Sequence, residues 1–361
     1  MSTLLIFLAG LVALVVGAEA LVRGASKMAL SFGISPLVVG LTIVAFGTSA
    51  PEMAVSVGAV LDGKTDIAIG NVIGSNVFNI LFILGVSALI TPLVVHLQLI
   101  RQEVPIMIGG TVLLLVLGWD GRITLFDGAL LFGLLLAYTV FLIVQSRRQV
   151  ASGSQATEFD AELQAPEAGA WDSRLPAQIG LLVVGLALLV LGSQWLVDAS
   201  VVFARSLGVS DVVIGLTIVS AGTSMPEVAA SVAAALNGER DIAVGNVVGS
   251  CTFNLFGCVG LGGLAAGLAG LPMPSSVMVF DIWVLLAVSL ACLPVFLTGR
   301  EIARWEGGLF LAYYCAYAAY LILAAQQHAA LQPFSAAMMG FVIPLSLVTL
   351  VVSLVRRVPS S

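Results

Sequence analysis

The chain has 361 residues, of which 60% are hydrophobic and only 9% are charged, and its mean hydropathy is +1.12. Soluble globular domains carry about 25% charged residues, so this composition excludes a soluble domain and predicts a polytopic helical membrane protein. The formal net charge of −6 comes largely from one connecting segment. The 14 basic residues are scattered at segment ends, which argues against a nucleic-acid-binding surface.

Apolar runs of roughly 20 residues, the length that crosses a bilayer, recur along nearly the whole chain. The first run has no basic residue before it, so it lacks the charged region of a secretory signal and is interpreted as the first span. The run at 104–118 is short, and the run at 242–270 has room for a bend or a re-entrant part. The predicted spans are 3–22, 36–61, 67–92, 104–118, 126–146, 177–197, 211–236, 242–270, 278–298, 307–325 and 335–355.

Two stretches of the chain carry nearly the same text, 175 positions apart. Residues 40–52 and 215–227 share ten of thirteen identities, and residues 66–79 and 241–254 share ten of fourteen. A common offset without a gap indicates an internal duplication. It maps the first five spans onto the sixth to tenth and leaves the eleventh as a C-terminal addition. Because five is odd, the copies have opposite orientations in the membrane, which is typical of secondary transporters.

The predicted fold is therefore an all-α polytopic membrane protein with two inverted-topology five-helix repeats, ten transmembrane helices in all, plus an eleventh helix. The predicted parts are a first repeat at 1–146, a polar linker at 147–176, a second repeat at 177–325 and an extra helix and tail at 326–361. Eleven Lys and Arg residues fall on one side of these spans and three on the other. The positive-inside rule then predicts an integral cell-membrane protein (plasma or inner membrane) with its N-terminus outside and its linker and C-terminus in the cytoplasm.

Each repeat places a single glutamate inside an apolar run. Glu52 is the only charged residue between Lys27 and Asp62, and Glu227 occupies the same position in the second copy. An ionised carboxylate inside a membrane is costly and by default indicates an ion or proton site. The alternative is a glutamate buried against a structural partner.

The neighbours of both glutamates are oxygen-bearing. Thr48 and Ser49 share a helical face with Glu52, and Pro51 cannot donate to the carbonyl of Gly47, which predicts free carbonyls from Ala45 to Thr48. The second copy repeats this at Pro226, with carbonyls from Ser220 to Thr223 and the hydroxyl of Ser224. In the following spans, Ser75 and Asn79, like Ser250 and Asn254, are four residues apart and share a face.

This set of ligands contains oxygen alone and suits Na⁺ or Ca²⁺, which takes 6–8 oxygens. Zinc, copper and iron are disfavoured because the only histidines, His96 and His328, lie at span ends. The four cysteines show no CxxC spacing and are interpreted as packing residues.

The motifs GTSAPE…GNVIGSNVFN and GTSMPE…GNVVGSCTFN resemble the two alpha-repeats of the calcium/cation antiporter superfamily, and most of all its sodium/calcium exchanger branch. The resemblance in layout covers residues 1 to about 325. It implies that Glu52 and Glu227 are acidic ligands shared by Ca²⁺ and Na⁺ and that Thr48 and Thr223 lend carbonyls to calcium. It also implies sodium ligands, with two asparagines flanking the centre: Ala45, Ser49, Ser75, Ser220, Ser224 and Ser250, then Asn79 and Asn254.

The chain departs from this pattern at three positions. Ser220 stands where the first repeat has Ala45, and Cys251 replaces Asn76 on a different helical face from the ligands. Some relatives carry an aspartate where this chain has Asn254, so any potassium dependence or protonation switch tied to that acid is in doubt.

The predicted function is antiport of Na⁺ and Ca²⁺ by alternating access, with these ions as substrates, a lipid bilayer as surroundings, no resident cofactor, no nucleic acid and no enzymatic activity. A Ca²⁺/H⁺ antiporter on the same fold is the alternative, because paired glutamates can share a proton. A cation channel and an intramembrane hydrolase using Ser49 or Ser224 are disfavoured, the second because no histidine lies at membrane depth. The sequence gives no oligomeric state, stoichiometry or flux direction.

Overall fold

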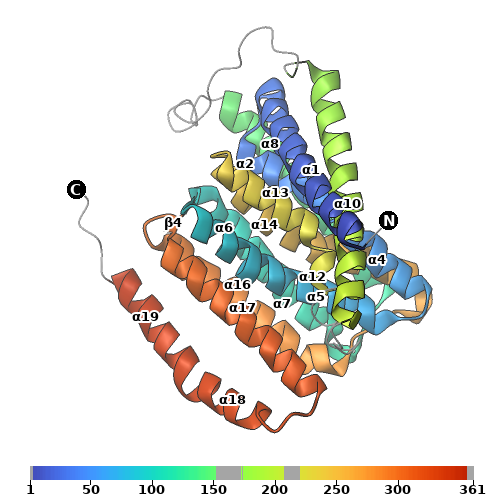
Figure 1. Ribbon diagram of the computed structural model, residues 1–361, viewed down its shortest axis with the longest axis vertical. Coiled ribbons are helices and arrows are strands. Elements are labelled where there is room, and N and C mark those ends of the chain that lie inside the picture. Colours follow the sequence, from blue (N-terminus) through green and yellow to red (C-terminus); the bar gives the residue numbers. More distant parts are fainter. Residues whose placement is uncertain (1–2, 152–171, 173, 207–219, 356–361) are drawn as a thin grey trace.

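The computed structural model describes residues 3–151, 172, 174–206 and 220–355, and throughout these ranges the chain is an almost entirely helical bundle (Figure 1). In the first half the helical elements are α1 (Thr3–Phe32), α2 (Pro36–Val39), η1 (Gly40–Val44), α3 (Ala45–Thr48), α4 (Ala50–Leu61), α5 (Thr65–Phe78), η2 (Asn79–Ile83), α6 (Leu84–Ile90), η3 (Leu99–Glu103), α7 (Val104–Leu117), η4 (Gly118–Asp120) and α8 (Leu125–Ala151).

The second half repeats this order and then adds a helix. Its elements are α10 (Leu175–Ser206), α12 (Ser220–Gly222), α13 (Met225–Leu236), α14 (Arg240–Phe253), η7 (Asn254–Cys258), α15 (Val259–Ala266), η8 (Gly267–Ala269), η9 (Val277–Asp281), α16 (Ile282–Leu297), α17 (Arg304–Ala325), α18 (Leu331–Ala337), η10 (Met338–Val342) and α19 (Ile343–Val355). Of these, η4 and η8 are 3₁₀ turns and the other η elements are π-helical turns.

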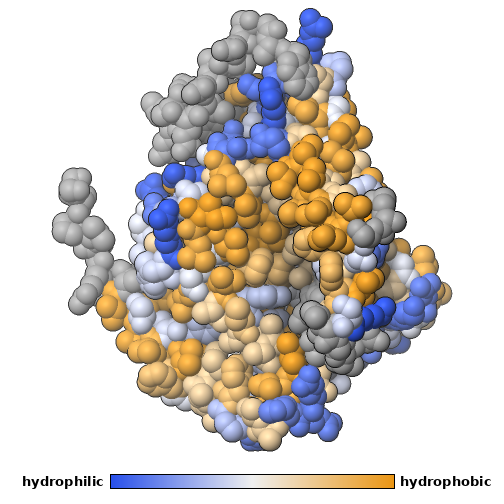
Figure 2. Space-filling model, in the orientation of Figure 1, coloured by the Kyte–Doolittle hydropathy of each residue, from blue (hydrophilic) through white to orange (hydrophobic). Residues whose placement is uncertain are grey.

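The described residues contain nine helices long and apolar enough to cross a membrane, or ten when the bent pair Pro36–Thr48 and Ala50–Leu61 counts as one span. The all-α polytopic membrane fold predicted from the sequence is therefore confirmed. Predicted span 211–236 begins outside the described residues, and its described part forms α12 and α13. Figure 2 shows large areas of apolar side chains on the surface, as contact with lipid requires.

Several spans are longer than their apolar runs suggest. The first continues to Phe32, because Leu21, Ala25 and Ala29 face the core while the charged Arg23 points outward. The fourth begins at Leu99 rather than 104, and the run expected to bend at 242–270 is helical from Arg240 to Ala269.

The duplication extends beyond the two motif stretches, but its offset changes. The π-turns η2 and η7 are 175 positions apart, whereas η3 and η9 are 178 apart. Four two-residue strands follow the same shift: β1 (Leu93–Val94) and β3 (Leu271–Pro272) are 178 apart, and β2 (Arg122–Ile123) and β4 (Glu301–Ile302) are 179 apart. A uniform 175-residue offset is thus wrong after the motif helices, because the second copy has extra residues in its later connections.

The strands join one repeat to the other. β1 pairs antiparallel with β4, and β2 pairs antiparallel with β3. Because the span Leu99–Asp120 lies between β1 and β2 in the chain, the two pairs lie at opposite ends of the bundle. The repeats are therefore tied together at both membrane faces.

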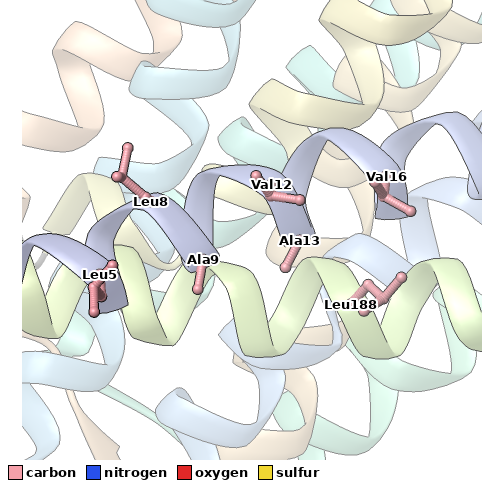
Figure 3. A pocket seen from close by; sticks show the side chains of 7 residues that line it. All are labelled: Leu5, Leu8, Ala9, Val12, Ala13, Val16 and Leu188. Atoms are coloured by element: carbon pink, nitrogen blue, oxygen red, sulfur yellow. The ribbon is translucent and has the colours of Figure 1, made fainter. Parts of the chain in front are cut away.

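The longest helices, α1 and α10, pack against each other along a stripe of glycines (Figure 1). A methyl group added at Gly17 would lie 2.9 Å from the carbonyl oxygen of Gly185, and one at Gly10 would lie 2.9 Å from that of Gly192. Small residues allow such close backbone approach between membrane helices. The outer side of this pair is a shallow apolar groove lined by Leu5, Leu8, Ala9, Val12, Ala13, Val16 and Leu188 (Figure 3).

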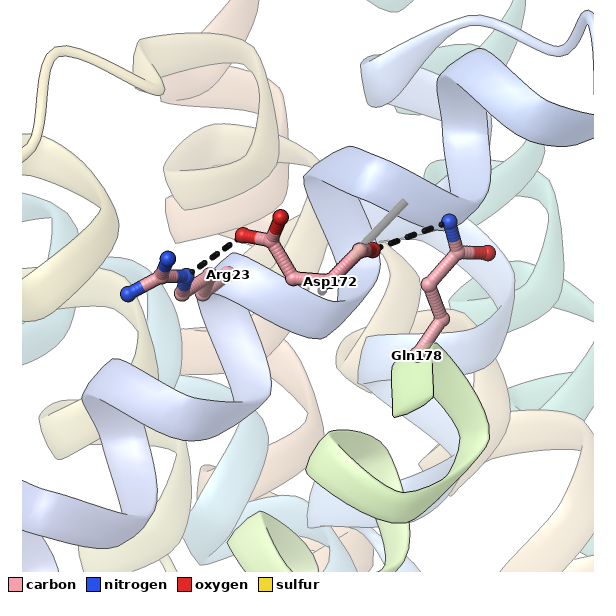
Figure 4. Close-up of polar contacts among 3 residues, drawn as sticks. All are labelled: Arg23, Asp172 and Gln178. Atoms are coloured by element: carbon pink, nitrogen blue, oxygen red, sulfur yellow. Dashed lines mark hydrogen bonds and ion pairs between the residues drawn. The ribbon is translucent and has the colours of Figure 1, made fainter. Parts of the chain in front are cut away.

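A polar contact closes the other end of the α1–α10 pair (Figure 4). Arg23 Nε donates to Asp172 Oδ2 at 2.8 Å, and Gln178 Nε2 donates to Ser31 Oγ at 2.7 Å and to the Asp172 carbonyl at 3.3 Å. The hydrogen bond from Arg23 holds the pKa of the Asp172 carboxyl below its usual range, so the pair stays ionised at neutral pH. The end of the segment that joins the repeats is thereby fastened to α1 as well as to α10.

Each repeat also contains an interhelical acid–tyrosine pair. Tyr138 on α8 donates to Glu103 at 2.7 Å, and Tyr317 on α17 donates to Asp281 at 2.9 Å. The acids end the equivalent turns η3 and η9. The pairs differ in burial: Glu103 is 0% exposed and is held also by Gln98 Nε2 at 2.9 Å, whereas Asp281 and Tyr317 are both partly exposed.

Replacing Tyr138 by Phe is expected to destabilise the protein by about 1–3 kcal/mol, because it removes a donor from a carboxylate that water cannot reach. The matched change Tyr317→Phe is expected to cost less, since Asp281 is only partly buried. Thermal unfolding of the detergent-solubilised variants measures both. An equal or larger loss for Tyr317→Phe would contradict this account of the two pairs.

Candidate functional site

The site begins with a break in the second span. α3 ends at Thr48 and α4 begins at Ala50, and the span bends by 43° between Pro36–Thr48 and Ala50–Leu61. Pro51 lies in the first turn of α4 and has no amide hydrogen to offer the carbonyl of Gly47. The second repeat has the same arrangement, with Ser224 between α12 and α13 and Pro226 in the first turn of α13. Non-helical backbone at membrane depth is tolerated where it is buried in protein or lines a cavity.

The breaks bring the two glutamates together. Ser49 Oγ donates to Glu227 Oε1 at 3.2 Å, and Ser224 Oγ donates to Glu52 Oε1 at 3.1 Å. Each serine therefore serves the carboxylate of the other repeat. Both glutamates are 0% exposed, and they lie close enough for their charges to repel.

One oxygen of each carboxylate is left without a partner. Among the described residues, no hydrogen bond reaches Glu52 Oε2, Glu227 Oε2 or either polar atom of the Asn79 side chain, although all are buried. Buried polar groups are nearly always hydrogen-bonded, and an unpaired charged oxygen is especially costly. Carboxylate and amide oxygens are atoms of the kind that hard cations prefer as ligands.

The remaining predicted ligands surround this centre. Ser224 Oγ also donates to Ser75 Oγ at 3.2 Å, and Thr48 Oγ1 lies 3.5 Å from Ser250 Oγ. Ala45 is buried, and its carbonyl accepts from the Ser49 amide at 3.0 Å, so it is not as free as the sequence suggested. Thr223 is partly buried, and of Ser220 only the backbone, at the start of α12, is described.

The two asparagines begin equivalent π-helical turns, η2 at Asn79 and η7 at Asn254. Single π turns within α-helices occur frequently at functional sites. Unlike Asn79, Asn254 is hydrogen-bonded: its Nδ2 donates to Asn76 Oδ1 at 3.1 Å, and Cys258 Sγ donates to its Oδ1 at 3.4 Å.

Four polar residues behind the ligands were not among the predicted ones. Thr48 Oγ1 donates to Asn246 Oδ1 at 3.2 Å, and Asn246 Nδ2 donates to Ser231 Oγ at 2.9 Å and to the Glu227 carbonyl at 3.4 Å. The mirror set is looser, with 3.4 Å from Thr223 Oγ1 to Asn71 and 3.4 Å from Asn71 to Ser56.

A sequence signal for these four residues exists. Asn71 and Asn246 lie four positions before Ser75 and Ser250, and Ser56 and Ser231 lie four positions after the glutamates. Residues four apart share a helix face, so the polar faces continue one turn beyond the predicted ligands.

Among the described residues no three His, Cys, Asp or Glu side chains cluster as a metal site. The centre instead combines two carboxylates with hydroxyl, amide and carbonyl oxygens. Such a set suits hard cations that accept several neutral oxygens.

Known exchanger proteins are similar to this chain over most of its length. The chain matches the family described as sodium/calcium exchanger protein over residues 2–144 and 177–323. It is 35% identical over 345 residues to the sodium/calcium exchanger MaX1 of Methanosarcina acetivorans, covering 87% of this chain and 96% of that protein. It is also 35% identical to the inner membrane protein YrbG of Escherichia coli strain K12, covering 71% and 78%. A solved structure of the sodium-calcium exchanger NCX_Mj superposes with a TM-score of 0.74 at 32% identity, covering 88% of this chain and 98% of that one.

Asn246→Ala is expected to lower the unfolding temperature more than the mirror change Asn71→Ala. Asn246 is fully buried and makes three hydrogen bonds, whereas Asn71 is partly exposed and makes two longer ones. Each buried polar group that Asn246→Ala leaves without a hydrogen bond lowers the free energy of unfolding by up to about 3 kcal/mol. Differential scanning calorimetry of the two variants in the same detergent measures both unfolding temperatures. A lower unfolding temperature for Asn71→Ala than for Asn246→Ala would show that the hydrogen bonds of Asn246 are not the more stabilising set.

Proposed function

The chain belongs to the sodium/calcium exchanger protein family, and on that premise we propose that it exchanges Na⁺ for Ca²⁺ by alternating access, with the cations bound at mid-depth between the repeats. Family membership makes the protein an integral membrane antiporter for cations and not an enzyme. The choice of Na⁺ as the coupling ion, the binding residues and the orientation are our proposal.

The observation that supports the proposal most is the pair of buried carboxylates, each with one oxygen that has no hydrogen bond to any described residue. Without a cation the pair carries a charge of −2 in a region of low dielectric, where each ion costs several kcal/mol. One Ca²⁺ or a set of Na⁺ ions removes this charge. An empty site therefore resists passage through a closed state while a loaded site permits it, which is the condition for exchange rather than leak.

The proposed ligands follow from this centre. Glu52 and Glu227 bind both cations, and the carbonyls of Thr48 and Thr223 complete the calcium site. Hydroxyl and carbonyl oxygens around the centre bind sodium, and they belong to Ala45, Ser49, Ser75, Ser220, Ser224 and Ser250. Two asparagines, Asn79 and Asn254, flank the centre.

Helix α10 is placed to control access, because it touches both breaks. A methyl group at Gly47 would lie 2.5 Å from the Leu186 side chain, and one at Gly222 would clash with the Val197 side chain. Ser193 Oγ on the same helix donates to the Gly222 carbonyl at 2.5 Å. We propose that α1 and α10 slide as one unit across the remaining helices and open the site to each side in turn. From the distribution of Lys and Arg, we also propose that the N-terminus lies outside and that the linker and C-terminus lie in the cytoplasm.

Exchange of Ca²⁺ for protons is the second candidate, favoured by the closeness of the two carboxylates, since one of such a pair can hold a proton. The serines that converge on the site favour sodium, because neutral hydroxyl oxygens add ligands without adding charge.

Glu52→Gln and Glu227→Gln are each expected to reduce Na⁺-dependent ⁴⁵Ca²⁺ uptake into proteoliposomes by at least about 100-fold, because one negative charge cannot balance a divalent ion in a buried site. Glu103→Gln, which changes a buried acid outside the site, is the matched control and is expected to retain uptake. Full uptake by either site variant would refute the assignment.

Ca²⁺ uptake by the unmodified protein is expected to follow an outward Na⁺ gradient and to be insensitive to a pH gradient in Na⁺-free buffer. Parallel measurements with Na⁺, K⁺ and H⁺ gradients decide the coupling ion. Uptake driven by the pH gradient alone would select the proton antiporter instead.

A further inference from the structure

The two asparagines that flank the site are not equivalent, although they begin equivalent turns. Asn254 is held at both ends of its amide, by Asn76 at 3.1 Å and by Cys258 at 3.4 Å. Asn79 is buried with neither end of its amide hydrogen-bonded among the described residues. The difference lies in what the duplication places beside each asparagine.

Both partners of Asn254 are missing from the mirror position. The counterpart of Asn76 is Cys251, and the counterpart of Cys258 is Ile83, each 175 positions away. A thiol is a weak hydrogen-bond donor and acceptor, and the isoleucine side chain has no hydrogen-bonding group. Cys251 interacts with Asn79, but a thiol holds an amide less firmly than the amide of Asn76 holds Asn254. Cys251, which stands where the first repeat has Asn76, therefore gives Asn79 a weaker hydrogen-bond partner than Asn254 has.

Each asparagine begins a turn that packs against the helix carrying the glutamate of the other repeat. The turn η2, which starts with Asn79, packs against α13, which carries Glu227, and the turn η7, which starts with Asn254, packs against α4, which carries Glu52. Within the described part of the chain, the site atoms without a hydrogen bond include Glu52 Oε2, Glu227 Oε2 and the amide of Asn79, whereas the amide of Asn254 is bonded.

We propose that Asn79 alone of the two supplies a side-chain oxygen to the transported cation, and that Asn76 and Cys251 determine this asymmetry. Asn76 fixes Asn254 as part of the wall, and the weak partner Cys251 leaves Asn79 free to turn its Oδ1 toward an ion. The inference rests on the proposed function, since it names which atoms of that site bind.

The first test compares alanine variants of the two asparagines. Asn79→Ala is expected to raise the half-saturating Ca²⁺ and Na⁺ concentrations about tenfold, which corresponds to about 1.4 kcal/mol of binding free energy. Asn254→Ala is expected to raise them less than about threefold. Equal effects of the two changes would overturn the proposal.

The second test exchanges the residues that lie beside the two asparagines. Cys251→Asn supplies Asn79 with the partner that Asn76 gives Asn254, and is expected to weaken cation binding about tenfold, whereas Cys251→Ala, which adds no amide, stays near the unmodified protein. In the swap Asn76→Cys with Cys251→Asn, the sensitivity to alanine is expected to move from Asn79 to Asn254. A swap that leaves Asn79 the sensitive position, or a Cys251→Asn variant with unchanged affinity, would contradict the proposal.

The readouts separate this inference from the proposed function. Thermal stabilisation of the purified variants by added Ca²⁺ or Na⁺ reports binding without transport, and it is measured alongside vesicle uptake. Uptake that does not depend on Na⁺ in the unmodified protein would refute the proposed coupling. The order of the ion-induced thermal shifts among the variants would still decide the role of Asn79.

Discussion

The structure depends on two carboxylates that the membrane does not solvate. Glu52 and Glu227 are fully buried, and each accepts one hydrogen bond from a serine of the opposite repeat, while its second oxygen has no hydrogen-bond partner among the residues that the structure describes. Such a pair is stable only when a positive charge joins it or when protons remove its charge. This requirement ties occupancy of the site to the conformations the protein can adopt.

The rest of the fold holds this pair in place. The helix breaks at Ser49 and Ser224 bring the glutamates inward. Hydrogen bonds to Asn246 and Asn71 hold the neighbouring Thr48 and Thr223 in place. Two short strand pairs tie the repeats at both ends. The glycines let α1 and α10 pack closely, and α10 touches both breaks, which suits two helices that move as a unit.

Much of this could be predicted from the sequence because the duplication and the isolated glutamates are local signals. The crossed serine–glutamate bonds could not, since they join residues about 175 positions apart and depend on how the inverted copies interlock. The long first span was underestimated because Arg23 and Lys27 lie on its outer side. The non-equivalence of Asn79 and Asn254 was missed because Cys251 belongs to a different helical face and acts across the repeat boundary.

A crystal structure of the protein soaked with Ca²⁺ or its heavier analogue Sr²⁺ would show whether the two carboxylates bind one cation together. We expect a single anomalous peak between them that contacts both Glu52 Oε2 and Glu227 Oε2, within the 2.3–2.6 Å that calcium takes to its oxygens. A peak that contacts only one of them, or ions bound elsewhere while the glutamates hydrogen-bond to each other, would contradict it.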